Sequence, residues 1–286
     1  MLRRHRRRHS VMTKTLPLPQ RVVIGIVADL REFWQYRSLL RMLVVRDVKT
    51  RYRNSVLGVL WSFLQPLGMM VVMTFAFTVI NRGPANMPHF NVFILSGLLA
   101  WNFFSAAVIS GSGSINANSA LVKKVFFPRA VLPVSAVISS LVNFLLALPV
   151  WLIVTVISGH ALHLSLLFLP FVIAIQVVFT VGVTFLLSTL NVFYRDTQFI
   201  IELGMLALFF LTPIWYDIGQ VSPEIGLWVR RLNPMASLVN IYQDLMYWGH
   251  VTDLDFVLRT ALTAFAFLVA GYLVFRRYSP RFGEEV

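Results

Sequence analysis

The sequence predicts an all-α membrane protein with six transmembrane helices, an N-terminal cytoplasmic amphipathic helix at the membrane interface, and short re-entrant outer helices before the last span. The first observation behind this prediction is composition: 57% of the residues are apolar, 13% are charged, and the mean hydropathy is +0.73. One globular core cannot hide that much apolar surface. The second observation is that apolar segments of about 20 residues recur, and helices of that length span a hydrocarbon core of about 30 Å.

The net charge of +13 agrees with a membrane protein. Lys and Arg accumulate on the cytoplasmic side of such proteins, so the charge predicts contact with a membrane and no nucleic-acid partner. The chain contains no cysteine, which excludes disulfide bonds and thiolate metal ligands.

The N-terminal region is divided into a tail and a surface helix. Residues 1–30 are expected to form a basic cytoplasmic tail that contacts anionic lipid, with Pro17 and Pro19 breaking any helix. Residues 31–55 are expected to form a helix lying in the membrane interface, since its two sides differ. The apolar side carries Phe33, Tyr36, Leu40, Leu43, Val44 and Val48, and the basic side carries Arg31, Arg46, Lys49 and Arg53.

The surface helix is expected to run directly into the first span. Between Arg46 and Leu67 a run rich in cations gives way to apolar residues from Val56 onward, with no intervening loop predicted. Asp47 and Arg51 stand four residues apart, a spacing at which they can pair. A force applied to the surface helix should therefore move the first span.

After the surface helix, we expect a transmembrane region over residues 56–276 and a cytoplasmic C-terminus at 277–286. The six expected spans are Val56–Ile80, Phe90–Ser110, Ala130–Ile157, Leu164–Leu190, Phe199–Trp215 and Phe256–Phe275. All but four of the 25 Lys and Arg residues then fall on one side, which the positive-inside rule makes cytoplasmic. The exceptions are Arg82, Arg230, Arg231 and Arg259.

The segment 216–250 is too polar to cross a membrane and too apolar for a plain loop. Asn233 is a good helix cap, with Pro234 at the first helical position. Apolar residues then recur on one helical face at Met235, Leu238, Val239, Tyr242, Leu245 and Met246. We expect two short helices that dip back into the outer leaflet, the alternative being a helix lying flat on the outer surface.

Three common catalytic motifs are missing from the sequence: the P-loop, His-Glu-x-x-His and Gly-x-Ser-x-Gly. There is no Gly-Lys dipeptide and hence no P-loop, so this chain is not expected to hydrolyse ATP by that route or to hold a metal or cofactor. A membrane enzyme that modifies lipid-linked glycans, using His89, His163 and an acid such as Asp253 or Asp255, is a less favoured alternative. The expected spans hold few ionisable residues; one is Glu202, which lies one helical turn from Gln198. This scarcity gives little support to an ion-coupled transporter.

Aromatic and polar residues within the spans are candidates for a substrate pathway, because aromatic faces suit sugar rings. The candidates are Trp61, Gln65, Trp101, Asn102, Phe104, Phe209, Trp215 and Tyr216. The alternative for each is packing or contact with lipid.

One pattern carries a family resemblance. It consists of Arg46, Asp47, Arg51, Tyr52, Ser55, Leu57, Gly58 and Trp61, and it resembles the start of the membrane subunit of ABC-2 type polysaccharide exporters, which move O antigen, capsule or teichoic acid. The segments Lys124–Arg129, Tyr194–Asp196 and Leu232–Pro234 also resemble family landmarks, in the expected order.

The resemblance implies a homodimer of six-span subunits, each contacting a separate ATP-hydrolysing subunit that binds ATP and Mg. Contact with that ATPase is implied for Arg46, Asp47, Arg51, Tyr52, Ser119, Lys123, Lys124, Phe126, Phe127, Arg129, Arg195 and Asp196. A role in an outer gate is implied for Asn233, Pro234, Tyr242 and Asp244.

The resulting hypothesis is the channel-forming subunit of an ATP-driven exporter in a bacterial inner membrane. It would move a lipid-linked polysaccharide similar to O antigen from the cytoplasmic to the outer face. An ABC-2 exporter of drugs or simple lipids is the alternative of the same mechanical class.

Overall fold

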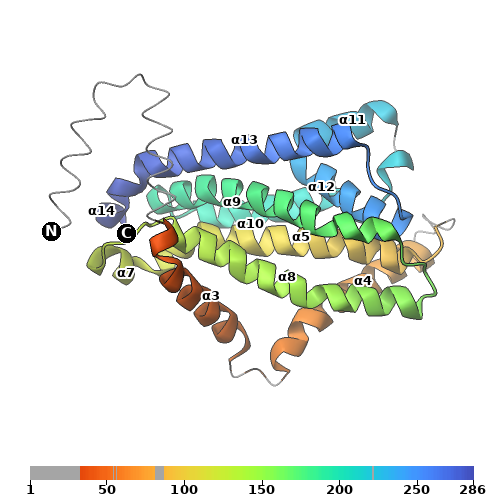
Figure 1. The fold of residues 1–286 in the computed structure, drawn as a ribbon, viewed down its shortest axis with the longest axis horizontal. Coiled ribbons are helices and arrows are strands. Elements are labelled where there is room, and N and C mark those ends of the chain that lie inside the picture. Colours follow the sequence, from red (N-terminus) through yellow and green to blue (C-terminus); the bar gives the residue numbers. More distant parts are fainter. Residues whose placement is uncertain (1–32, 54, 56, 81–86, 221) are drawn as a thin grey trace.

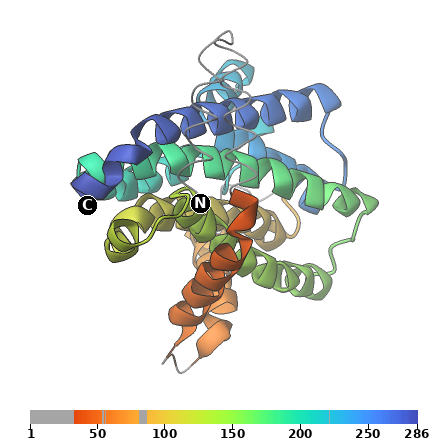
Figure 2. The ribbon, with the colours of Figure 1, turned by 60° about the vertical axis from the view of Figure 1, so that its left-hand side comes forward.

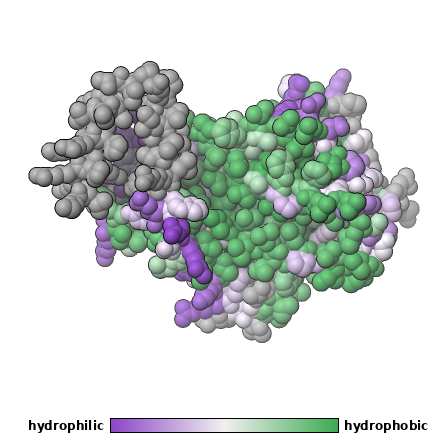
Figure 3. All heavy atoms as spheres, in the orientation of Figure 1, coloured by the Kyte–Doolittle hydropathy of each residue, from purple (hydrophilic) through white to green (hydrophobic). Residues whose placement is uncertain are grey.

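The computed structural model describes residues 33–286 except 54, 56, 81–86 and 221. The predicted tail, residues 1–30, lies outside the described residues. So do residues 31 and 32, the first two of the predicted interface helix, and the separate positions Val56 and Arg82. The described chain is built from helices and contains no strand. In the face shown in Figure 3, apolar side chains cover the middle and hydrophilic residues gather toward both ends, as expected of a membrane protein.

Long helices lie side by side along the body (Figure 1). They are α4 (Trp61–Phe75), α5 (Phe90–Ser112), α8 (Val131–Ile157), α9 (Leu169–Phe193) and α13 (Leu254–Tyr278). A π-helical turn, η3 (Ala76–Ile80), extends α4, and a 3₁₀ segment, η4 (Leu164–Phe168), precedes α9. These five are long and apolar enough to cross a membrane. The predicted fifth span is the shorter helix α10 (Thr197–Leu211), whose 15 residues reach about 22 Å.

Short helices lie at the two ends of the body (Figures 1 and 2). One end carries α3 (Arg37–Tyr52), α6 (Ser114–Ala117), α7 (Ser119–Lys124), η7 (Ser279–Arg281) and α14 (Phe282–Glu285). The other carries η5 (Ile218–Gln220), α11 (Pro223–Leu232), α12 (Pro234–Gln243) and η6 (Asp244–Trp248). The first end holds most of the described Lys and Arg residues and is called the basic end below.

The predicted fusion of the surface helix with the first span is wrong. Helix α3 ends at Tyr52, and Arg53 is extended with ψ 134°. Gly58 has φ +50°, a left-handed conformation that favours glycine, and a 3₁₀ turn, η2 (Gly58–Leu60), leads into α4 at Trp61. The two helices meet at an angle in Figure 1, so a turn and not a continuous helix connects them.

Helix α3 also lies differently from a helix resting on lipid alone. It packs against α8, and Leu43 is buried. Tyr36 and Leu40 pack against a cluster of buried residues at the basic end. The predicted apolar side therefore contacts the subunit itself, while Trp34 and Met42 are exposed.

The core is arranged around α5, which buries most of its side chains against α4, α8, α9, α10 and α12. Helices α9 and α13 make the closest pair. A Cβ atom built on Gly271 would lie 2.1 Å from the carbonyl oxygen of Gly182. Small residues thus let these two backbones approach closely, as is common between membrane helices.

Candidate functional site

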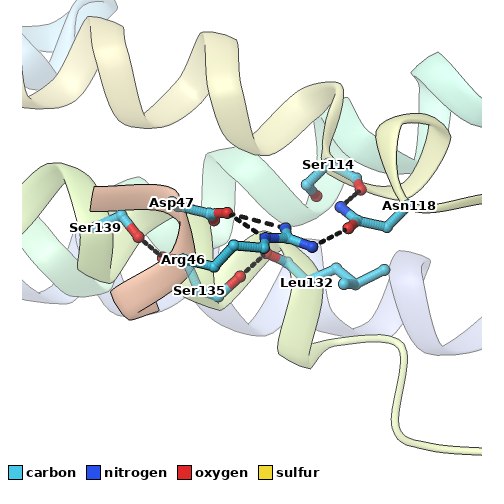
Figure 4. A network of polar contacts seen from close by, with 7 residues as sticks. All are labelled: Arg46, Asp47, Ser114, Asn118, Leu132, Ser135 and Ser139. Atoms are coloured by element: carbon cyan, nitrogen blue, oxygen red, sulfur yellow. Dashed lines mark hydrogen bonds and ion pairs between the residues drawn. The ribbon is translucent and has the colours of Figure 1, made fainter. Parts of the chain in front are cut away.

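The basic end brings α3 into contact with the α5–α8 connection. The guanidinium of Arg46 donates from Nε and Nη2 to Oδ1 of Asp47, at 3.0 and 2.9 Å, and from Nη1 to Oδ1 of Asn118 at 2.9 Å. Figure 4 shows Arg46 lying between these two partners. The predicted pairing of Asp47 with Arg51 is replaced by pairing with Arg46, whose side chain reaches the next element.

Tyr52 attaches the C-terminal end of α3 to the body. Its hydroxyl donates a 2.8 Å hydrogen bond to Oδ1 of Asn143 in α8. Arg51, one residue earlier, is exposed. Of the predicted surface-helix residues, Arg46 and Tyr52 therefore connect α3 to the body, and Arg51 is free to face a partner or a lipid headgroup.

The α7–α8 segment presents an apolar side chain among cations. Ser119 begins α7, and Lys123 and Lys124 are exposed in its last turn. Phe126 is 94% exposed, while Phe127 packs against the basic-end cluster. Large exposed apolar groups often mark sites of protein contact, so Phe126 is the better candidate of the two for docking.

Arg129 and the C-terminus lie together beside this segment. A Cβ atom on Gly283 would lie 3.2 Å from Nη2 of Arg129, and burial lowers the pKa of that guanidinium. The ring of Phe282 is fully buried against Phe193 and Phe275. Sequence reasoning missed Phe282, although an apolar aromatic side chain in a polar C-terminal segment is a signal of docking onto the body.

The α9–α10 turn completes the basic end. Tyr194, Arg195 and Asp196 are all exposed there. The predicted coupling residues thus come from three elements at one end of the molecule, with Phe126, Lys124 and Arg195 available to solvent.

Three of the predicted pathway residues are buried in the subunit core. Trp101 and Phe209 are 4% and 6% exposed, with ring centroids 5.9 Å apart. Phe104 is 3% exposed and stacks on Phe179. Burial assigns these three to packing, because no surface of theirs is open to a substrate.

Helix α5 nevertheless has one partly exposed stripe in its basic-end half, called the open stripe below. The side chains that are not buried there are Asn102, Ser105, Ala106, Ile109 and Ser110. Their spacing of three or four residues places them on one helical face. Glu202 in α10 is exposed, and its Oε1 accepts a 3.0 Å hydrogen bond from Nε2 of Gln198. Trp61 and Gln65 are exposed on α4.

The outer part of the candidate pathway is aromatic. Trp215 stacks on Phe77 with centroids 4.8 Å apart, and Tyr216 meets Trp215 edge-on. Trp215, Tyr216, Phe210 and Asp217 help to line an open groove of about 480 Å³. The Trp215 indole Nε1 is buried without a hydrogen-bond partner among the described residues.

The predicted gate helices are α11 and α12. Asn233 caps α12: its Oδ1 accepts from the backbone N–H groups of Met235 and Ala236, and its Nδ2 donates to Thr212 at 2.8 Å. All six residues of the predicted apolar stripe are at most 1% exposed. Helix α12 is therefore buried in the helical core, whereas α11 exposes Ile225 and Trp228 at the surface.

Asp244 follows α12 and is mostly buried. Its carboxylate accepts a 2.7 Å hydrogen bond from Thr252 and lies 3.6 Å from Nε2 of His250. Burial raises the pKa of this carboxyl group, against the opposing effects of Thr252 and His250.

The alternative catalytic set is only partly assembled. His89 and His163 both contact the ring of His160, at 5.5 and 5.9 Å between centroids. Asp253 instead lines a surface groove with Asp255 and Arg259. The described contacts thus join His89 to His163 through His160, whereas Asp253 lies in a separate groove.

Comparison with known proteins gives the family. Residues 38–247 match the family described as ABC-2 type transporter. The chain is 37% identical over 257 residues to the O-antigen export system permease protein RfbA of Myxococcus xanthus, covering 90% of this chain and 98% of that protein. An RfbA of Klebsiella pneumoniae is 32% identical over 86% of this chain and 94% of its own length. The polysialic acid transport protein KpsM of Escherichia coli is 22% identical over 74% of this chain and 82% of its own. Since the family match covers more than half of the sequence, the chain belongs to the ABC-2 type transporter membrane family.

Proposed function

We propose that this chain is the channel-forming subunit of an ATP-driven exporter of a lipid-linked polysaccharide similar to O antigen. The observation that carries the proposal is the similarity over nearly the full length of two O-antigen export permeases. In the proposal the polymer moves from the cytoplasmic to the outer face of a bacterial inner membrane.

The energy source is a separate ATPase subunit that docks on the basic end. The sequence has no P-loop, and the basic end offers exposed Phe126 beside Lys123 and Lys124. An apolar anchor among charges is typical of a protein interface. ATP and its magnesium ion are then bound by the partner, and this chain converts the partner's movement into opening.

The pathway follows the open stripe of α5 outward to the aromatic groove. Asn102 and Ser105 provide hydrogen-bonding groups for sugar hydroxyls, and Trp215 and Tyr216 provide apolar faces. The polar stripe and Glu202 favour an aqueous surface over lipid, since polar groups in hydrocarbon are costly. Exposed Trp61 and Gln65 of α4 complete the proposed lining.

Two copies enclose the pathway in this proposal. Helix α4 is only 11% buried in its span, and α10 buries three side chains, Ile201, Met205 and Phe209. Both helices therefore leave faces that a second copy can cover. The basic end faces the cytoplasm with both termini on that side, as the distribution of Lys and Arg favours.

Substrate class is tested on the purified complex of this chain and its cognate ATPase in nanodiscs. The proposal predicts that lipid-linked polysaccharide stimulates ATP hydrolysis and that small amphiphiles do not. Stimulation by amphiphiles alone would favour the drug or simple-lipid exporter. Chemical modification of a lipid-linked glycan by the wild type, lost in His89→Ala, His163→Ala and Asp253→Ala, would instead favour the glycan-modifying membrane enzyme.

A further inference from the structure

The connection between α5 and α7 turns through residues 109–118, called the corner segment here. It ends α5, contains α6 and stops just before α7. Side chains of α3, α9 and α10 all form hydrogen bonds to it. These contacts join the basic-end surface to α10, and no part of the proposed function above uses them.

The α3 side of the corner segment is held through Asn118. Its Oδ1 accepts from Arg46 at 2.9 Å, and its Nδ2 donates to the carbonyl of Ser114 at 2.7 Å. Figure 4 shows this path from Asp47 through Arg46 and Asn118 to Ser114. Ser135 and Ser139, also drawn there, bond only to carbonyls of their own helix, so they join no elements.

The opposite side is held by α9 and α10. The hydroxyl of Ser112 shares its proton between the Ile109 carbonyl of its own helix, at 2.9 Å, and Oε1 of Gln198, at 3.0 Å. Nδ2 of Asn191 donates to the Ser112 carbonyl at 3.1 Å. Asn116 donates from Nδ2 to the Asn191 carbonyl at 2.9 Å. Nε2 of Gln198 continues the path to Glu202 on the open face of α10.

The corner segment has little room to slip between these contacts. A Cβ atom on Gly111 would lie 2.2 Å from Cγ2 of Thr184, so the backbone sits directly on α9. Closely packed elements of this kind transmit displacement because they do not deform continuously.

Helix α10 is well suited to respond. Its three buried side chains leave it lightly attached along its length. Its polar contacts at the basic end, through Gln198, are therefore a large part of what positions it against α5. Moving the corner segment would shift α10 together with Glu202.

We propose that the corner segment couples α3 to α10, with Asn118, Asn191 and Gln198 as positioning residues that transmit the partner's movement to the pathway. The inference rests on the proposed function, because it needs an ATPase docked at the basic end. It adds which internal contacts carry the movement and which helix receives it.

The test uses the absence of cysteine, which allows one label at a chosen site. Met42→Cys on α3 and Leu203→Cys on α10 are exposed positions for a spin label or fluorophore. Each is measured in the complex with the cognate ATPase, before and after a non-hydrolysable ATP analogue binds. In the wild-type background both labels should respond.

Gln198→Leu should leave the α3 response unchanged and reduce the α10 response by roughly fivefold or more, with ATP hydrolysis continuing while export falls. Asn118→Leu removes the hydrogen bond between the corner segment and Arg46 of α3. It should likewise leave the α3 response unchanged and reduce the α10 response. Ser188→Ala is the matched control, since this buried α9 hydroxyl bonds only to the Phe185 carbonyl of its own helix. Both labels should respond in Ser188→Ala as they do in wild type. A reduced α10 response in this control would mean that any disturbance of α9 packing lowers the response.

An undiminished α10 response in both Gln198→Leu and Asn118→Leu would overturn the inference and leave the proposed function standing. If neither label responds in the wild-type complex, docking at the basic end is overturned, and the inference with it. An α10 response without an α3 response would likewise exclude the corner segment as the route.

Discussion

The hydroxyl of Tyr242 donates a 2.7 Å hydrogen bond to Oε1 of Gln176, and both side chains are fully buried. Gln176 also donates from Nε2 to the carbonyl of Ala100 at 2.7 Å. One glutamine therefore joins α9 to α5 and to α12. A satisfied polar contact of this kind fixes the position of α12, because leaving it unmade in an apolar core is costly.

Tyr242→Phe should lower the apparent unfolding temperature of the purified protein. The change keeps the ring and leaves Oε1 of Gln176 without its donor, which costs about 1 to 3 kcal/mol. Thermal unfolding followed by intrinsic fluorescence measures the effect. Tyr194→Phe, at a residue 69% exposed, is the control and should melt like wild type. Equal melting of all three proteins would exclude a structural role for the Tyr242 hydroxyl.

Gly271→Ala should disrupt the packing of α13 on α9. The new methyl group would meet the backbone oxygen of Gly182, which cannot move aside as a flexible side chain would. We expect poor folded yield and a lower unfolding temperature. Gly204→Ala provides the comparison, since nothing lies within 4 Å of its Cβ position in α10. If both variants express and melt alike, the two helices are not as close as described.

Gly58→Ala should weaken the turn between α3 and α4 by about 1 kcal/mol, because a side chain is disfavoured at positive φ. The Cβ position itself is open, so the cost is conformational and not a clash. Gly68→Ala, also in open space but helical, should be neutral or stabilising, and the difference between the two melting temperatures is the measurement.

Acidification should destabilise the region around His160. Burial lowers the pKa of His160, neighbouring His89 and His163 lower it further, and the hydrogen bond to the Tyr247 carbonyl opposes the shift. The unfolded chain then binds more protons at this site than the folded one, so the stability contribution is present above pH 6.5 and is lost as pH falls through the folded pKa. Unfolding temperatures measured at about pH 7.5 and about pH 5.5 should differ more for wild type than for His160→Gln. An identical pH dependence in the two proteins would contradict this assignment.

Phe126→Asp should weaken binding of the ATPase subunit, because it removes an exposed apolar anchor without touching the core. Co-purification of the two subunits from detergent measures it. Leu164→Asp is a matched control, since Leu164 is 84% exposed at the opposite end of the molecule. Loss of binding in the control but not in Phe126→Asp would place the partner on the outer side.

Much of the fold was predictable because hydropathy and helical spacing report burial in a membrane directly. The stripe from Met235 to Met246 predicted the buried face of α12 and η6, and Asn233 predicted the cap of α12. The turn at Gly58 was not predictable, since a glycine between a basic and an apolar run carries no sign of a left-handed backbone. The sequence alone therefore predicts a continuous helix across this position.

The pathway residues show where sequence reasoning stops. Trp101, Phe104 and Asn102 lie on one helix, and hydropathy cannot tell which of them meets another helix and which stays open. The structure separates them, because neighbouring helices bury Trp101 and Phe104, whereas Asn102 and Ser105 are only partly buried. The pairing of Arg46 with Asn118 was equally hidden, because it joins residues 72 positions apart in the chain.

The central claim is that a separate ATPase drives this chain from the basic end. Its most direct test is transport of lipid-linked polysaccharide across the membrane of proteoliposomes, with this chain alone and with the cognate ATPase. The account predicts transport only when both the ATPase and hydrolysable ATP are present. Transport by this chain alone, at the rate of the complex, would contradict it.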